Sequence, residues 1–443
     1  MTASAATAST GADLHRFIAE LYPICRSITG DGVRETLSRI GEIIPLEVHE
    51  VPSGTSVLDW TVPPEWNIRG AWVRDADGET VVDFDESNLH VVSYSTPIRA
   101  RVSRQELAEH VHTLPEWPDR IPYRTSYYDE TWGFCMPHRM LEGLVDEEYE
   151  VLIDSSLEQG SLTYGECLLP GETDEEVLVS CHVCHPSLCN DNLSGIAVAT
   201  FLASELSARP RRYTYRFLFV PGTIGSISWL ARHPEDVHRI RHGFVLAGVG
   251  DAGDLNYKRS RRGDADIDRV VEHVLEHRSE DYGIQDFSPY GYDERQFCSP
   301  GYDLPVGCLM RTPWGTYPEY HTSADDLDFV QPDSLEDSLD ACLSAVDVLE
   351  GNRVYVNLSP HGEPKLGRRG LYDSIGGRVS PEDGLLAVLW VLNQSDGEHD
   401  LLAIAERAGL EFGVIRRAAD VLLEHELLEE LPAEAARARE TTA

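Results

Sequence analysis

The residues that most constrain the fold of this chain are 177–206, where an apolar run, a polar knot and a second apolar run follow one another. Val177–Ser180 has the composition of a buried strand, and Ile196–Leu206 that of an amphipathic helix. Between them, residues 181–191 hold two histidines, three cysteines and an aspartate. Strand, loop and helix form the unit of an α/β protein, in which ligands gather beyond the carboxyl ends of the strands. We therefore expect the functional site at this loop.

Other apolar segments repeat the same alternation. We predict further strands at 150–155, 165–169, 213–220 and 244–249, and helices at 196–206, 267–277 and 334–349. Strands that alternate with helices imply a mostly parallel sheet covered on both faces. Two amphipathic helices are expected over 14–44, separated at the turn 29–32.

The character of the sequence changes twice, which predicts three parts. Residues 46–102 read as short strands divided by turn signals, with Trp60 and Trp66 in their core, and the Pro- and aromatic-rich stretch 107–129 reads as a covering loop. Beyond Gly351, three short helices indicate a helix-turn-helix or winged-helix arrangement. The predicted boundaries are a discontinuous main domain, an inserted β-rich module and a C-terminal domain, at 1–60 with 130–352, 61–129 and 353–443.

The charge of the chain argues against several partners. Acidic residues outnumber basic ones 76 to 37, for a formal charge of −39. No basic face can outweigh such a field, so we expect neither nucleic acid nor an anionic membrane as a partner. Arg416 and Arg417, on the third C-terminal helix, are surrounded by acidic residues. A structural role, including homo-oligomer formation, is therefore favoured over DNA binding for this domain.

The N-terminal residues MTASAATASTGADLHRF lack the basic and apolar regions of a secretion signal. No stretch approaches the roughly 18 apolar residues of a spanning helix. We therefore expect a cytoplasmic protein whose nine cysteines are reduced thiols.

Four segments offer side chains for one metal site, each at a strand end or in an adjoining loop. The candidates are His182 and Asp191, Asp251, the pair Asp293 and Glu294 in GYDERQF, and His321 in EYHTSADDLD. Imidazole together with carboxylate suits zinc, and a carboxylate can bridge two ions. Open positions on such a metal hold water, lower its pKa and polarise a carbonyl group.

The cysteines in the knot allow other interpretations. Cys181 to His185 fits the haem-attachment pattern C-x-x-C-H, but that chemistry requires an exported chain. A structural zinc ion on Cys181, Cys184 and Cys189 lacks a second C-x-x-C pair. Buried thiols that act as small hydrophobic side chains are the favoured interpretation.

The same motifs carry a family resemblance. SCHVCHPSLCNDNLSG, a strand ending in PGTIGS, then GVGD, GYDERQFCSPGYDLPVG and EYHTSADD resemble the zinc aminopeptidases of the phosphorylase/hydrolase-like fold. Those enzymes show H-x-D, D-N-x-S-G, a glutamate-containing turn, an aspartate after a strand, and a late H-T-x-x-D. LYPICRSITGDGVRETL, VPSGTSVLDWTVPPEWNI and EPKLGRRGLY resemble the aminopeptidase-like proteins found beside polysaccharide and natural-product biosynthesis genes.

This resemblance implies an α/β fold: an aminopeptidase domain with a central mixed, mostly parallel sheet, an inserted β-rich module and a C-terminal winged helix. It implies metal ligands at His182, Asp191 and His321, and less securely at Asp251. For His185, the role of a residue that supports a metal ligand is favoured over the role of a ligand. Cys184 replaces the aspartate that orients the first histidine in the family, so another group must take that hydrogen bond.

The chain departs from the family at Gly222. Relatives carry glutamate there, and glutamates of that turn act as general base and as ligand of a second metal. Either the base has moved, with Glu294 and Asp293 the candidates, or peptidase activity is lost. Asp293 and Glu294 could equally be structural acids paired with arginine.

Two functions follow from these residues. The first is a zinc-dependent amide or peptide hydrolase for a small aminoacyl or peptidyl biosynthetic intermediate, with one zinc ion favoured over two and Glu294 as general base. The alternative is a catalytically impaired homologue that serves as a binding or assembly protein, motivated by Gly222 alone.

Overall fold

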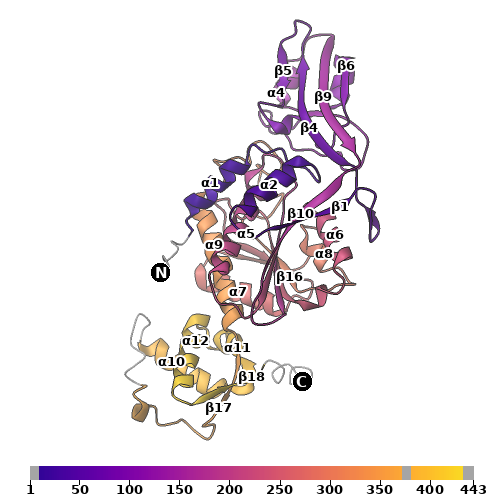
Figure 1. The fold of residues 1–443 in the computed structure, drawn as a ribbon. Coiled ribbons are helices and arrows are strands. Elements are labelled where there is room, and N and C mark those ends of the chain that lie inside the picture. The colour runs from indigo at the N-terminus through magenta and orange to yellow at the C-terminus, as the bar shows by residue number, and fades with distance from the viewer. Residues whose placement is uncertain (1–8, 372–380, 433–443) are drawn as a thin grey trace, which may run out of the picture. The chain divides into compact units, whose positions relative to one another are not determined.

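The computed structural model describes residues 9–371 and 381–432 of the chain (Figure 1). The chain divides into two compact units. One comprises residues 1–268 and 281–340, and the other comprises 269–280 and 341–443.

The first unit is built on an eight-stranded sheet with the order β1-β10-β12-β11-β13-β16-β14-β15. Its central strands β12, β11, β13 and β16 run parallel, whereas β1, β10 and β14 join antiparallel neighbours. The predicted mixed sheet with a parallel centre is confirmed. The strands are β1 (Glu47–Pro52), β10 (Ser161–Leu169), β11 (Glu176–His182), β12 (Thr214–Val220), β13 (Ile240–Leu246), β14 (Asn256–Lys258), β15 (Gly283–Gln285) and β16 (Val306–Met310).

Burial explains why the central strands are apolar throughout. Every residue of β11 and β12 is buried, because helices cover both faces of the sheet. Figure 1 shows α5 and α6 on either side of the sheet that contains β10 and β16. The helices of this unit are α1 (Gly11–Leu21), α2 (Asp31–Gly41), α5 (Gly195–Ser207), α6 (Ile224–Arg232) and the short α8 (Glu294–Phe297), and α7 (Asp266–Arg278) and α9 (Pro332–Gly351) extend from it into the second unit.

A separate four-stranded antiparallel sheet, in the order β5-β4-β9-β6, has its own hydrophobic core. Trp66 is buried as predicted, but it packs in the core that includes residues of the eight-stranded sheet and not in that of the four-stranded sheet. Trp60 is 43% exposed, so its predicted place in the core is wrong. Trp60 lies in the short β2–β3 hairpin, with its ring near that of Tyr128. The elements are β2 (Ser56–Val57), β3 (Trp60–Thr61), β4 (Glu65–Arg74), β5 (Thr80–Asp83), β6 (Ile98–Ser103), α3 (Arg104–Glu109), β7 (Val111–His112), β8 (Phe134–Cys135), α4 (His138–Glu142) and β9 (Glu148–Glu158).

Within the described residues beyond 353, the second unit has the helices α10, α11 and α12 and a three-stranded antiparallel sheet, β18-β17-β19, which together form a winged helix. The turn after α11 has Gly409 at φ 63°, a left-handed conformation that glycine adopts without strain. The elements are β17 (Val354–Asn357), α10 (Pro381–Gln394), β18 (Asp396–Asp400), α11 (Leu401–Ala408), α12 (Phe412–Glu424) and β19 (Leu428–Glu430). Among the described helices of the whole chain, none is long and apolar enough to cross a membrane.

Candidate metal centre

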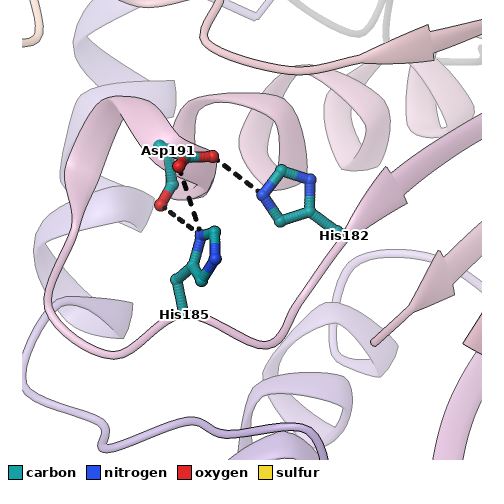
Figure 2. Close-up of side chains that lie close together, drawn as sticks. All are labelled: His182, His185 and Asp191. Atoms are coloured by element: carbon teal, nitrogen blue, oxygen red, sulfur yellow. Dashed lines mark hydrogen bonds and ion pairs between the residues drawn. The ribbon is translucent and has the colours of Figure 1, made fainter. Parts of the chain in front are cut away.

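Asp191 is the centre of the site. It is fully buried in the irregular turn Cys189–Ser194, between the end of β11 and the start of α5. Its Oδ1 lies 2.8 Å from Nε2 of His182, the last residue of β11, and its Oδ2 lies 2.9 Å from Nε2 of His321. The His185 Nδ1 is 3.4 Å from Oδ2, as Figure 2 shows for His182, His185 and Asp191. One carboxylate therefore faces three imidazoles.

The turn that carries Asp191 is held by buried polar groups. The Asp325 carboxylate accepts hydrogen bonds from the backbone N–H groups of Asn190 and Asp191, at 2.5 and 3.0 Å. The Arg26 guanidinium, also buried, donates to the carbonyl oxygens of His185 and Pro186, each at 2.8 Å. These bonds satisfy irregular backbone that would otherwise be buried without partners.

The protonation states of these groups suit a metal ion. Burial opposes the charge on Asp191, but His185, His182 and His321 together hold the pKa of its carboxyl well below the usual range. Burial lowers the pKa of His182 and of His321, which favours neutral imidazoles. Single ligand atoms of His182, His185 and Asp191 lie within 4.8 Å of one another. Neutral His182 and His321 imidazoles beside an ionised carboxylate fit zinc. Burial opposes the charge on His185 as well, but the carboxylate of Asp191 outweighs it and raises the pKa of His185, so this imidazole is the one that favours its protonated form.

The first histidine, which the family pattern pairs with an aspartate, lies beside Asn192 instead. Nδ1 of His182 lies 3.3 Å from the amide nitrogen of Asn192, which is itself tied to the carbonyl oxygen of Leu246 at 3.0 Å. Cys184 instead points its thiol toward the carbonyl oxygen of Gly222, at 3.8 Å. Burial raises the pKa of the Cys184 thiol to about 12, so this group is an inert thiol. All nine cysteines are free.

The Asp251 carboxylate is close to the site, but other protein groups donate hydrogen bonds to it. Its carboxylate accepts hydrogen bonds from the Asn190 side chain at 2.9 Å, the Thr312 hydroxyl at 2.5 Å and the backbone N–H of Gly253 at 2.8 Å. Asn190 belongs to the turn of Asp191, and its side-chain amide ties Asp251 to that turn. The structure therefore does not bring Asp251 into the cluster of His182, His185 and Asp191.

Asp293 lies beside Gly222. A Cβ atom on Gly222 would be 3.7 Å from both carboxylate oxygens of Asp293 and 3.2 Å from the His182 Cβ. Ser226 donates to Oδ1 of Asp293 at 3.1 Å, whereas Oδ2 is buried without a partner among the described residues. Burial raises the pKa of Asp293 to about 7. A carboxyl group from another loop thus faces position 222, where the family resemblance leads us to expect a glutamate.

Glu294, the next residue, points elsewhere. Its Oε1 accepts a hydrogen bond from Lys258 Nζ at 2.7 Å, and both side chains are buried. Lys258 also donates to the carbonyl oxygen of Tyr290 at 2.9 Å. Glu294 does not line the cavity at the site, whereas Asp293 does.

The cavity has a volume of about 260 Å³, near the lower end for small-molecule pockets. The segment predicted to cover the site reaches it: the Tyr123 N–H donates to the His321 carbonyl oxygen at 2.8 Å, and the Tyr123 ring is 5.0 Å from that of His185. Aromatic and charged side chains line the cavity around the histidines: Tyr127, Tyr290, Tyr292, Trp314, Tyr320, Asp293 and Arg295.

Several residues of the site were not identified from the sequence. Asp325 has a signal, since it is the aspartate of the H-T-x-x-D pattern, with a role in holding the backbone. Tyr292, whose hydroxyl lies 3.3 Å from Asp191 Oδ1, and Asn190 have no signal beyond their neighbours. Arg295, which follows Asp293 and Glu294 in the sequence, also lines the cavity without a signal of its own.

Comparisons with known proteins agree with this architecture. A family model described as a domain of unknown function (DUF4910) matches residues 15–352, and a winged helix-turn-helix model matches 353–430. A protein from Clostridium acetobutylicum, named for polysaccharide biosynthesis and an aminopeptidase-like domain, is 53% identical over 95% of this chain and 97% of its own length.

Solved structures show the same relation. The crystal structure of a Clostridium acetobutylicum protein named as a peptidase is similar with a TM-score of 0.91 and 52% identity, over 95% of this chain and 96% of that one. A zinc aminopeptidase from Bacillus subtilis is similar in fold, with a TM-score of 0.56 and 14% identity over 77% of this chain and 95% of that one. The predicted family resemblance is confirmed. The chain belongs to the DUF4910 family, and it combines an aminopeptidase-like fold with a C-terminal winged helix-turn-helix domain.

Proposed function

We propose that this protein is a zinc-dependent amide hydrolase that cleaves a small aminoacyl or peptidyl substrate, with Asp293 as its general base and acid. The observation that carries the proposal is the position of Asp293. Its unpartnered Oδ2 belongs to a side chain that lines the same cavity as His182 and His321, beside Gly222.

His182, Asp191 and His321 are the proposed zinc ligands, with His185 beside them. Bound zinc would polarise the scissile carbonyl group and lower the pKa of a water molecule. A single ion is favoured, because Gly222 offers no side chain for a second one and the Asp251 oxygens are occupied by Asn190 and its other donors.

Asp293 has the properties that a proton shuttle needs. Its pKa of about 7 lets it take a proton from water and return it to the leaving amine near neutral pH. Ser226 orients one oxygen and leaves the other free. Glu294 is a poorer candidate, because Lys258 occupies its Oε1 away from the cavity. The base role is thus assigned to Asp293 in place of Glu294.

The relatives support a biosynthetic substrate. The 53% identical protein is named for polysaccharide biosynthesis, and a cavity of about 260 Å³ has room for a small molecule or for the end of a longer one. We propose that the present chain likewise acts on a small biosynthetic intermediate.

Zinc analysis and a panel of aminoacyl amides test this function. The zinc-loaded wild type should hydrolyse at least one amide, and Asp293→Asn should lower kcat by about 10²–10⁴-fold. His182→Ala should lose both zinc and activity. Glu294→Gln, the neighbouring acid, is the matched control and should keep most of the activity once its folding is verified. A zinc-loaded wild type that hydrolyses no amide would support an impaired binding protein instead.

A further inference from the structure

One wall of the cavity carries a cation without an anion. Arg295 is half-buried and lines the cavity, and its Nε is buried without a hydrogen-bond partner among the described residues. No ion pair joins Arg295 to any carboxylate in the described part of the chain. Elsewhere the arginines of this acidic chain find partners readily, as Arg259 does with Asp286 at 2.9 Å. An unpaired guanidinium in a cavity is therefore a feature to explain.

Asp293 lies near enough for the charge of Arg295 to oppose the rise of its pKa that burial causes, but it accepts no hydrogen bond from Arg295. Both side chains line the cavity, but the only hydrogen bond to the Asp293 carboxylate among the described residues comes from Ser226. The guanidinium therefore keeps its donors for something that enters from outside. With a net charge of −39, the chain repels anions in general, so an anionic ligand needs such a local cation.

The walls beside Arg295 are aromatic. Tyr127 and Tyr290 line the cavity while 57% and 71% exposed, which places them toward its opening. Tyr292 and Trp314 meet edge to face with ring centroids 5.4 Å apart. Aromatic rings offer broad apolar contact to a flat group of a ligand. Guanidinium and aromatic walls together suit a ligand that joins an oxyanion to a flat or apolar part.

We propose that Arg295 binds an oxyanion, a carboxylate or a phosphate, on the substrate of this site. Guanidinium matches such groups with two parallel N–H···O bonds, which gives orientation as well as affinity. That the bound molecule is a substrate rests on the proposed function, whereas the binding of an oxyanion by Arg295 does not. Arg295 would place the charged end of the molecule so that its amide faces the zinc ligands.

The test is binding of small probes to the zinc-loaded, full-length protein by calorimetry. Benzoate and phenyl phosphate are the anionic probes, and benzamide is a neutral probe of the size of benzoate. Wild type should bind at least one anionic probe about tenfold or more tightly than benzamide, since a hydrogen bond to a charged group contributes this much. The better of the two anions tells carboxylate from phosphate. Arg295→Gln should lose the preference, Arg295→Lys should keep part of it, and Arg39→Gln, an exposed arginine on α2, should keep all of it.

Three results would overturn the inference. The first is that the wild type binds the anionic and neutral probes equally well. The second is that Arg295→Gln keeps the preference for the anion, because the anion binds zinc. The third is that neither anion binds to the wild type at about 10 mM. Failure of the proposed function is distinguishable. If benzoate binds through Arg295 but no amide is hydrolysed, only the hydrolase proposal fails. If anionic and neutral amides are cleaved with equal KM by wild type and Arg295→Gln, only the oxyanion proposal fails.

Discussion

The substitution Asp293→Asn should make the protein more stable and less active. The Asp293 side chain is buried, and the pKa of its carboxyl, about 7, compares with an ordinary value of 3.8. The folded chain therefore holds this proton up to about pH 7, whereas the unfolded chain releases it near pH 4. Stability of the wild type is lost as the pH rises through this window. Each pH unit of the difference corresponds to about 1.4 kcal/mol, so the loss approaches about 4 kcal/mol at most.

Asparagine has nearly the same shape and does not ionise. The free energy of unfolding of Asp293→Asn should therefore equal that of the wild type near pH 4 and exceed it by up to about 4 kcal/mol at pH 8. Urea unfolding of the metal-free proteins, followed by tryptophan fluorescence at a series of pH values, measures the difference. Asp328→Asn, which changes an exposed carboxylate, is the control and should show no such trend.

The activity of the same variant should move in the opposite direction. Loss of the proton shuttle lowers kcat by about 10²–10⁴-fold while zinc content stays the same. A variant that is less stable than the wild type at pH 8, or a stability difference that does not change with pH, would refute this account of Asp293. It would indicate that the carboxylate is a structural acid, ionised and paired in the folded protein.

Three further substitutions test neighbouring parts of the site. Gly222→Glu should lower kcat/KM, because the new carboxylate would meet that of Asp293, and Gly222→Glu combined with Asp293→Gly should recover part of the loss. Lys258→Met leaves the Glu294 charge buried and unpaired, so it should lower the free energy of unfolding by about 3–5 kcal/mol. Replacing both Lys258 and Glu294 by methionine should cost less, and urea unfolding measures both variants. Arg26→Met leaves backbone carbonyls without donors, so it should cost about 2 kcal/mol or more in the same assay and weaken zinc binding in a chelator competition.

The sequence predicts the frame of the site well. β11 ends at His182 because an apolar run meets a polar knot, and strand ends of a parallel sheet meet at one edge. His321 joins Asp191 from far along the chain, and only the family pattern indicates this pairing in advance. That these groups bind zinc stays a prediction.

The sequence could not tell which neighbour of a pair faces the cavity. Asp293 and Glu294 lie where irregular backbone leads into a helix of one turn, so no periodicity assigns their directions. Asp251 follows its strand as the family pattern implies, but the amide of Asn190 binds its carboxylate. Trp60 was misplaced because a short exposed hairpin and a buried strand share the same residue types.

The covering segment is joined to the metal centre through the main chain. The Tyr123 N–H bonds to the carbonyl oxygen of His321, and Pro122 and Thr322 form an isolated antiparallel bridge. Backbone bonds do not depend on which side chains the two strands carry. Side chains of the covering segment can therefore change in the course of evolution while its backbone still bonds to the loop of His321. A family built in this way can vary the residues above the cavity while the loop of His321 keeps its backbone contacts.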